Sequence, residues 1–349
     1  MFIATPEFTH ELESNMQTII ENSYSSLLDN LWWQRVAARK NSVSKKEVFI
    51  WLISTAVIKN MESGQADFED LLSTYTEIEN KFASAGLTLK KDQLEDVYNG
   101  TPGGEGLALA ARWAQDVGTQ AAYWPQKKVS EAILNGASAG YTTYDGLTFF
   151  NTAHYLNGKD TDDGTFSNIL NPTTVGHATR IDSAVTIDAA INNMSAIRAY
   201  IAEIKSSNGV DPRNLRMKAI LHPPALRSRV VQLTTASLVA QDAAGGGAGG
   251  ADVRAVVDDW KLETPLEAPE LSAAHGGSDT TFYIVANDSP GDGELGALVY
   301  QDREPFNVTY HGPDAAPQLA RMRELQYLMQ GRNTVGYGHP YQLFQVNVS

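Results

Sequence analysis

Apolar residues recur at three- and four-residue steps near the start of the chain, which is the pattern of one helix face. It predicts a helix from Pro6 to about Lys40, with Thr5 as a suitable N-cap and Pro6 at the first helical position. A stripe this long must be covered, either by the protein's own core or by a neighbouring subunit. It consists of Phe8, Leu12, Met16, Ile19 or Ile20, Tyr24, Leu27 or Leu28, and Leu31.

The next segment alternates between extended and polar stretches. Aromatic and β-branched residues predict a buried strand over Val48–Ile58. A short helical piece is expected around Phe68–Tyr75, and a second strand near Lys81–Lys90. Two strands with a long polar excursion between them predict an extended hairpin, which a compact monomer would have little reason to keep. Glycine and proline over residues 99–104 then mark a clear break.

The clearest helical pattern follows this break and runs from Glu105 to about Leu134. Pro125 is expected to kink the helix, because proline removes a backbone hydrogen bond and clashes with the preceding turn. Gly136 fits a C-terminal stop. The apolar side of this helix consists of Leu107, Ala110 or Ala111, Ala114, Val117, Ala121 and Trp124.

The second half of the chain mixes helices with strands, and this order indicates the α+β class. Asp145-Gly146 lies between aromatic and β-branched residues and predicts a hairpin. An amphipathic helix is predicted over Ile181–Ser207, and glycine and alanine form a flexible loop over 243–251. The predicted strands are Met217–Leu221, Thr281–Ala286, Ala297–Gln301, Pro305–Tyr310 and Tyr341–Val348, and a helix opened by Pro223-Pro224 is predicted to run to Leu233.

Composition narrows the functional classes. The chain has 349 residues, 42% of them hydrophobic, which suggests about two globular domains and excludes a wholly disordered chain. A net charge of −14 disfavours a general nucleic-acid binder. The absence of cysteine removes disulfides, thiolate metal sites and cysteine nucleophiles. The first residues lack a secretory signal, and the longest apolar run, over Val48–Ile58, is too short to cross a membrane, so we expect a soluble protein.

A basic strip interrupts this acidic chain over residues 34–46, and it contains no acidic residue. It can be read as a solvated face, or as a docking strip for an acidic surface of a neighbouring subunit, with DNA phosphates as the competing partner. We take the subunit interface as the hypothesis. The cations of the strip are Arg35, Arg39, Lys40, Lys45 and Lys46.

Candidates for catalysis are weak. His154 follows Asp145 by nine residues, and Ser130, Ser138 and Ser167 are near in sequence, but no Gly-x-Ser-x-Gly elbow accompanies them. Histidines are scattered without metal-ligand spacing, and the glycine-rich loop lacks the Gly-Lys-Ser/Thr ending of a phosphate cradle. Asp258-Asp259 has no surrounding EF-hand pattern. We therefore predict no catalytic, cofactor or metal site, and we expect Asp145 and His154 to be structural.

Three stretches stand out by their order and spacing. They are Tyr75–Phe82 with Leu87–Leu89 and Asp92–Asp96; Gln120–Pro125 with Ala132–Leu134 and Tyr144–His154; and Ile197–Val210 with Leu215–Leu226. The first ends a strand in an acidic run, the second contains a Pro-broken helix and an Asp-Gly-x-x-Phe-Phe-x-Thr-x-His block, and the third joins a helix, a strand and a Pro-Pro helix. Together they resemble the major head subunit (gpT-like) family of Mu-like phages and prophages.

The resemblance implies the tailed-phage coat protein fold of the Hong Kong 97 type. Its parts would be an N-terminal arm (1–44), an extended loop (45–100), a spine helix with peripheral domain (101–180), an axial domain (181–300) and C-terminal strands that return to the peripheral domain (301–349). The arm matches no family motif, so its assignment depends on the hydrophobic pattern alone.

The resemblance also implies a function without catalysis. The chain would form hexamers and pentamers of an icosahedral shell around double-stranded DNA, without sequence-specific DNA contacts and without a membrane. Scaffold, portal and decoration proteins are the other expected partners, and the expected location is the virion, after assembly in the host bacterial cytoplasm. The alternatives are a cargo-filled nanocompartment or gene-transfer particle and, more distantly, a hydrolase that uses Asp145 and His154.

Overall fold

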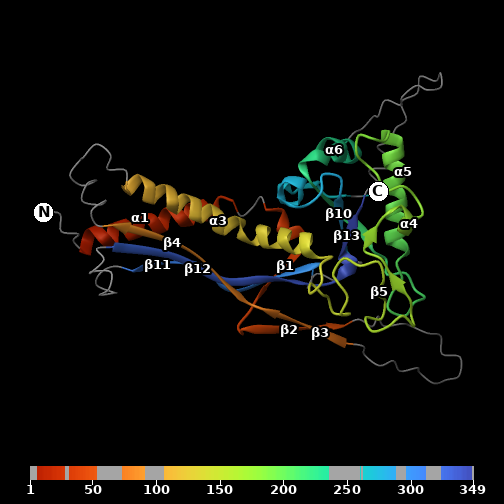
Figure 1. Ribbon diagram of the computed structural model, residues 1–349, viewed down its shortest axis with the longest axis horizontal. Coiled ribbons are helices and arrows are strands. Elements are labelled where there is room, and N and C mark those ends of the chain that lie inside the picture. Colours follow the sequence, from red (N-terminus) through yellow and green to blue (C-terminus); the bar gives the residue numbers. More distant parts are fainter. Residues whose placement is uncertain are drawn as a thin grey trace, which may run out of the picture.

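The computed structural model describes residues 6–27, 31–52, 73–90, 106–235, 260, 262–287, 296–311 and 324–347. The molecule is elongated, with two long helices lying along a long sheet at one end and a more compact assembly of helices and strands at the other (Figure 1). A two-stranded hairpin runs beside the long sheet, on the side away from the helices (Figure 1).

The elongated part contains helices α1 (Pro6–Ser25) and α3 (Gly106–Asn135), which pack on each other and cover one face of a four-stranded sheet. Met16 and Ile20 of α1, Val117 of α3 and Tyr327 of the sheet are buried in one shared core. The strands of this sheet, in spatial order, are β1 (Ala37–Asn41), β11 (Leu298–His311), β12 (Glu324–Tyr337) and β4 (Lys81–Lys90).

The compact part is built on a five-stranded sheet covered by α5 (Ile187–Glu203) and α6 (Arg227–Thr235). Met194, Ile197 and Phe344 lie at the centre of its core and are fully buried. The strands, in spatial order, are β7 (Ile169–Leu170), β13 (Leu343–Val346), β10 (Phe282–Asn287), β8 (Arg216–His222) and β9 (Leu266–Glu267). β13, the last strand along the chain, thus lies beside β10, whereas β11 and β12 run along α3. The domain boundaries given above stay a prediction.

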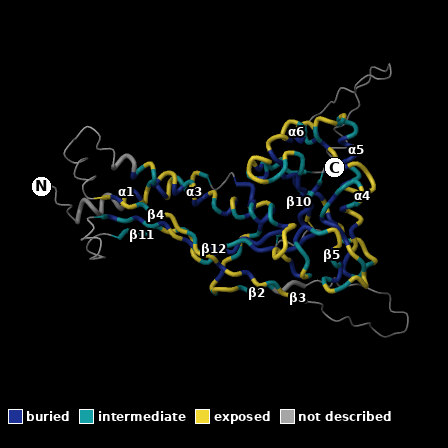
Figure 2. Tube along the Cα trace, in the orientation of Figure 1, coloured by how far each residue is buried: buried dark blue, intermediate teal, exposed yellow. Residues whose placement is uncertain are grey.

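Shorter elements connect the two parts. A further core lies where they meet and includes Trp32, Trp33, Phe149 and Tyr283, and Figure 2 shows buried positions concentrated in this region. The remaining elements are β2 (Lys46–Leu52), β3 (Ser73–Glu79), β5 (His154–Tyr155), β6 (Thr165–Phe166), α4 (Pro172–Val175) and the single-turn helices η2 (Trp32–Arg35), η3 (Pro224–Leu226), η4 (Pro269–Leu271), η5 (Ala273–His275) and η6 (Pro340–Gln342).

The first predicted helix is too long. It ends at Ser25 rather than near Lys40, and residues 37–41 instead form β1, which pairs in parallel with β11. Trp32 and Trp33 are buried in the core where the two parts meet, and residues 37–41 pair with a distant strand. Both interactions outweigh the local helical pattern here. Pro6 does occupy the first helical position.

The predicted hairpin exists with a different pairing. β2 pairs antiparallel with β3, whereas the predicted second strand, β4, pairs with β12. The helical piece expected around Phe68–Tyr75 is wrong at residues 73–75, which belong to β3. Residues 53–58 of the first predicted strand lie outside the described residues.

The long helix α3 confirms its prediction within one residue at each end and continues through Pro125. Gly118 lies where α1 crosses, and a Cβ atom added there would be 2.6 Å from the carbonyl oxygen of Ile20. This close approach of two backbones explains a glycine in the middle of a helix, where it otherwise costs stability. The predictions of α5, β8 and α6 are also confirmed, although α5 is shorter than Ile181–Ser207.

Candidate assembly surfaces

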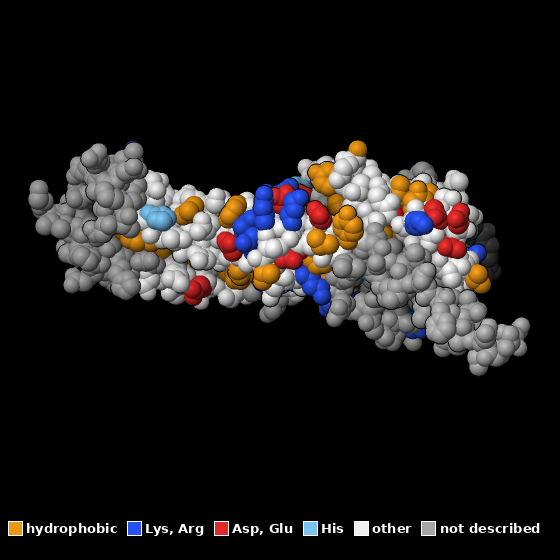
Figure 3. Space-filling view, turned by 90° about the horizontal axis from the view of Figure 1, so that it is seen from below, with side chains coloured by type: hydrophobic (Ala, Val, Ile, Leu, Met, Phe, Trp, Pro, Cys, Tyr) orange, Lys and Arg blue, Asp and Glu red, His pale blue; other side chains and the backbone are white. Residues whose placement is uncertain are grey.

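The β2–β3 hairpin has one covered and one open face. Phe49 and Ile78 point inward and pack against Tyr144 and Val299. The register pairs Val48 with Glu77 and Ile50 with Tyr75, so Val48 and Tyr75 share the opposite face. Val48 is 53% exposed and Tyr75 66% exposed. Seen from below, hydrophobic, acidic and basic side chains gather near the middle of the long axis, where this hairpin runs (Figure 3).

The turn between β1 and β2 is ordered by one carboxylate. Oε1 of Glu47 accepts hydrogen bonds from the backbone N–H groups of Val43 (2.9 Å) and Ser44 (3.0 Å) and from the hydroxyl of Ser42 (3.0 Å). These backbone hydrogen bonds hold the pKa of Glu47 below its ordinary value. Asn80, at the end of β3, donates to the Ser42 hydroxyl and to the Ser44 carbonyl. The turn is therefore held by Glu47 of β2 and by Asn80, directly after β3.

Replacing Glu47 by glutamine is expected to loosen this turn in a pH-dependent way. Because the folded protein lowers the pKa of Glu47, the ionised carboxylate stabilises the fold above its ordinary pKa of 4.5, and this contribution is lost as the pH falls through the lower folded value. At neutral pH, we expect the amides of Val43 and Ser44 to exchange hydrogen roughly tenfold faster in Glu47→Gln, in line with one charge-assisted hydrogen bond. Hydrogen exchange measures this. The exposed Glu304→Gln is the control, and unchanged exchange in Glu47→Gln would contradict the role.

Four of the five cations of the basic strip form ion pairs within their own chain. The fifth, Lys40, forms no ion pair in the described part of the chain. The carboxylate of Asp302 is 6% exposed, so its pair with Arg39 is the most protected; the other pairs are solvent-exposed and stabilise by about 0–1 kcal/mol each. The pairs are Arg35–Glu263 (2.8 Å), Arg39–Asp302 (2.5 Å), Lys45–Glu79 (3.0 Å) and Lys46–Glu77 (3.5 Å).

Asp145 and His154 meet as a buried pair. Nδ1 of His154 lies 2.6 Å from Oδ2 of Asp145, both side chains are fully buried, and Nε2 of His154 lies 3.0 Å from the carbonyl oxygen of Phe149. Asp145 also accepts the backbone N–H of Leu147, in the tight turn that Asp145-Gly146 predicts. Both ring nitrogens are thus engaged in holding the loop.

Among the described residues, this arrangement contains no nucleophile beside His154. A catalytic histidine directs Nε2 at a serine hydroxyl, but here that nitrogen faces a backbone carbonyl. The hydroxyls of Ser130 and Ser167 donate to the carbonyls of Lys127 and Ile169, and Ser138 is exposed. Within the described residues no group of acidic or histidine side chains could hold a metal ion. The glycine-rich loop and Asp258-Asp259 lie outside the described residues.

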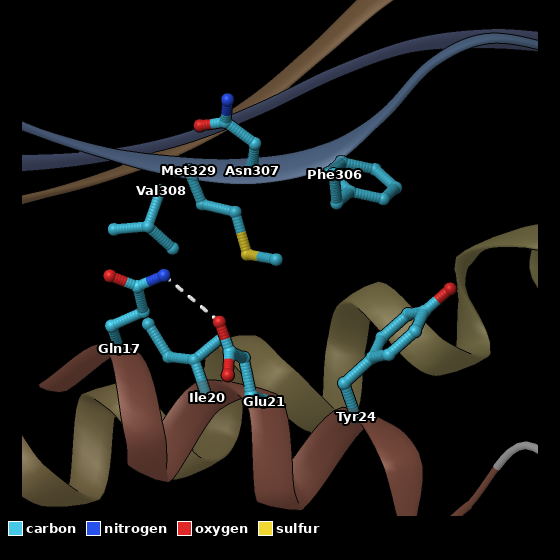
Figure 4. Close-up of a pocket in the computed structure, with 8 residues that line it drawn as sticks. All are labelled: Gln17, Ile20, Glu21, Tyr24, Phe306, Asn307, Val308 and Met329. Carbon is cyan, nitrogen blue, oxygen red and sulfur yellow. Dashed lines mark hydrogen bonds between the residues drawn. The ribbon is translucent and has the colours of Figure 1, made fainter.

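A pocket opens between α1 and the long sheet (Figure 4). It has a volume of about 290 Å³, an apolar floor and a polar rim. Gln17 donates a hydrogen bond to Glu21 at the rim (2.9 Å). The lining residues are Gln17, Ile20, Glu21, Tyr24, Phe306, Asn307, Val308 and Met329.

Sequence reasoning missed the β1–β2 turn and this pocket. A usable signal for the turn was Val43 as a lone apolar residue among Ser42, Ser44 and Lys45. The pocket had no signal, because α1 and β11 are far apart in the chain.

Comparison with known proteins identifies relatives of this fold. The model of the Mu-like prophage major head subunit gpT family matches residues 10–183, about half of the chain. A search of curated proteins gave no match. Among the described residues, no helix is both long and apolar enough to span a bilayer.

Solved capsid structures share the fold at low sequence identity. The capsid of the cyanophage P-SCSP1u matches with a TM-score of 0.51 and 12% identity, over 91% of this chain and 88% of that one. The mature capsid of bacteriophage PhiM1 gives 0.50 and 11%, over 91% and 87%. The capsid of Myoviridae phage XM1 gives 0.50 and 10%, over 90% of both chains. The predicted α+β, tailed-phage coat protein (Hong Kong 97-type) fold is therefore confirmed. The family match places the chain in the Mu-like prophage major head subunit gpT family, the major capsid proteins of tailed phages.

Proposed function

We propose that copies of this chain assemble into hexamers and pentamers, which close into an icosahedral shell around double-stranded DNA. The observation that carries the proposal is the open face of the β2–β3 hairpin. Val48 and Tyr75 stay exposed there, although the opposite face of the same hairpin is packed on the subunit. Exposed apolar side chains on a projecting element are suited to contact with a neighbouring copy.

The negative net charge of the chain is suited to a shell whose inner surface does not bind DNA tightly. A net charge of −14 lets the shell contain DNA without adhering to it, so we propose no sequence-specific DNA contact. Scaffold, portal and decoration proteins would join the shell in the host bacterial cytoplasm. We propose no catalytic activity, since the buried Asp145–His154 pair has no serine beside it in the described part of the chain.

The basic strip keeps its proposed role at a subunit interface, with DNA as the competing partner. Because Arg35, Arg39, Lys45 and Lys46 already pair within the chain, substitutions there would also disturb the subunit itself. Lys40 is the residue that tests an intermolecular role most cleanly.

Expression of the chain alone is expected to yield capsomers, tubes or closed shells at micromolar concentration under some solution condition. Electron microscopy and sedimentation measure this directly, and nucleic-acid content distinguishes a DNA container from a shell filled with protein cargo. A clean monomer at all salt concentrations and pH values, also with scaffold protein added, would refute the proposal.

A further inference from the structure

The β1–β2 turn presents one hydrophobic side chain to solvent. Val43 is 90% exposed, the highest value among the large hydrophobic residues that the structure describes. A single exposed valine is ordinary, but this one lies on a turn that Glu47 and Asn80 hold in place through its backbone and Ser42. A fixed turn loses little entropy when its tip is buried by a partner. Val43 is therefore preorganised to insert into a pocket.

The pocket between α1 and the long sheet has a suitable size and lining. Ile20 and Met329 form its buried floor, each 4% exposed, and Val308 contributes to its wall. Figure 4 shows these side chains pointing toward one another between α1 and the long sheet. A cavity of roughly 150 Å³ already accepts a benzene-sized group, so about 290 Å³ accommodates a valine and its adjoining backbone.

Charge provides the match between the two surfaces. Lys40 precedes the Val43 turn and forms no ion pair in the described part of the chain. Glu21 lies exposed at the pocket rim, where its carboxylate accepts a hydrogen bond from Gln17. An apolar tip beside a cation thus corresponds to an apolar pocket beside a carboxylate.

We propose that Val43 of one subunit inserts into the α1–β11 pocket of a neighbouring copy, with Lys40 facing the Glu21 carboxylate of that copy. The Val43 turn and the pocket are different surfaces of the same chain. The contact is therefore heterologous (head-to-tail), and such contacts can repeat from copy to copy around a ring. The proposal rests on self-assembly and names one of its contacts.

Cysteine pairing tests the contact, because the natural chain has no cysteine. The double variant Val43→Cys/Gln17→Cys, assembled under reduction and then mildly oxidised, should give a ladder of linked chains on a non-reducing gel. The matched control pairs Gln17→Cys with Val210→Cys, a valine 78% exposed on another turn, and each single variant is a second control. Particles that form normally but show no ladder beyond the controls would overturn the contact while leaving self-assembly intact.

Exchanging the charges of Lys40 and Glu21 tests the same contact independently, and it does so even if the cysteine variant fails to assemble. Lys40→Glu should lower the association constant between copies about tenfold or more, because two carboxylates then face each other. Adding Glu21→Lys in the same chain should restore assembly toward the wild-type level. Val43→Asp should impair assembly without changing the thermal unfolding of the isolated subunit. Normal assembly of Lys40→Glu, or no rescue by the double exchange, would contradict the proposed contact; failure of the wild-type chain to assemble would instead refute the proposed function.

Discussion

Replacing His154 by alanine is expected to destabilise the subunit by about 3–5 kcal/mol, the usual cost of leaving a buried carboxylate without its partner. The Asp145 carboxylate would stay fully buried, with the backbone N–H of Leu147 as its remaining donor among those described. The imidazole also packs on Phe166, with ring centroids 5.3 Å apart, so alanine would leave a cavity as well. Denaturant unfolding of the unassembled subunit measures the loss.

The exposed His177→Ala is the matched control, and we expect its free energy of unfolding to stay within about 0.5 kcal/mol of the wild type. Assembly yield should fall with stability in His154→Ala. A stable His154→Ala subunit would show that the pair contributes little. An enzymatic activity lost in this variant while particles still form would instead revive the hydrolase alternative.

Substitution of Gly118 is the second change with a large expected effect. In an exposed helix, alanine is more favourable than glycine by about 1 kcal/mol. At Gly118, however, the added Cβ would lie 2.6 Å from the Ile20 carbonyl oxygen and 2.9 Å from Cβ of Ser23. Both atoms belong to α1, so α1 must move away from α3. We expect Gly118→Ala to destabilise the subunit by about 1–3 kcal/mol, the cost of overpacking, and Gly118→Val by more.

Limited proteolysis should locate this effect, because α1 would be cleaved earlier than α3. Gln120→Ala, an exposed position of the same helix, is the control and should leave α1 protected. If Gly118→Ala raises stability instead, the two helices have room to separate and their close approach is not required.

Long helices with clear punctuation could be predicted from the sequence. The α3 helix combines a continuous small and apolar stripe with Gly136 directly after its end. The α5 helix combines an apolar stripe with Thr186, an N-cap residue, directly before its start. Both patterns are local, so no knowledge of distant partners is needed.

Strands that depend on distant partners could not be predicted in this way. The whole of β12 was missed, because Gly331 and Gly336 interrupt its pattern. The structure requires both glycines: a Cβ at Gly331 would be 2.9 Å from the Phe306 ring, and one at Gly336 would be 2.2 Å from the Ile78 side chain. β11 was predicted as two strands, Ala297–Gln301 and Pro305–Tyr310, whereas it is continuous, and its register shifts between Asp302 and Asn307, where the predicted break lies.

For the candidate surfaces, too, local features could be predicted from the sequence, whereas contacts between distant segments could not. Residue type alone identified the basic strip, but its ion partners come from β3, β11 and the segment before β9, which only the fold brings near. The structural role expected for Asp145 and His154 stays a prediction, made because Asp-Gly is typical of a turn. The contact between Nε2 of His154 and the carbonyl oxygen of Phe149 is visible only in three dimensions.

The parallel pairing of β1 with β11 has a consequence for synthesis. Ala37 pairs with Leu298, so the ribosome must complete most of the chain before β1 has a partner. At roughly 5–20 residues per second, this delay is on the order of tens of seconds. During that time the β1 backbone and its flanking turn lack the strand that positions them. A truncated chain that ends before β11 is therefore expected to lack this surface, and with it the subunit contact proposed for Val43.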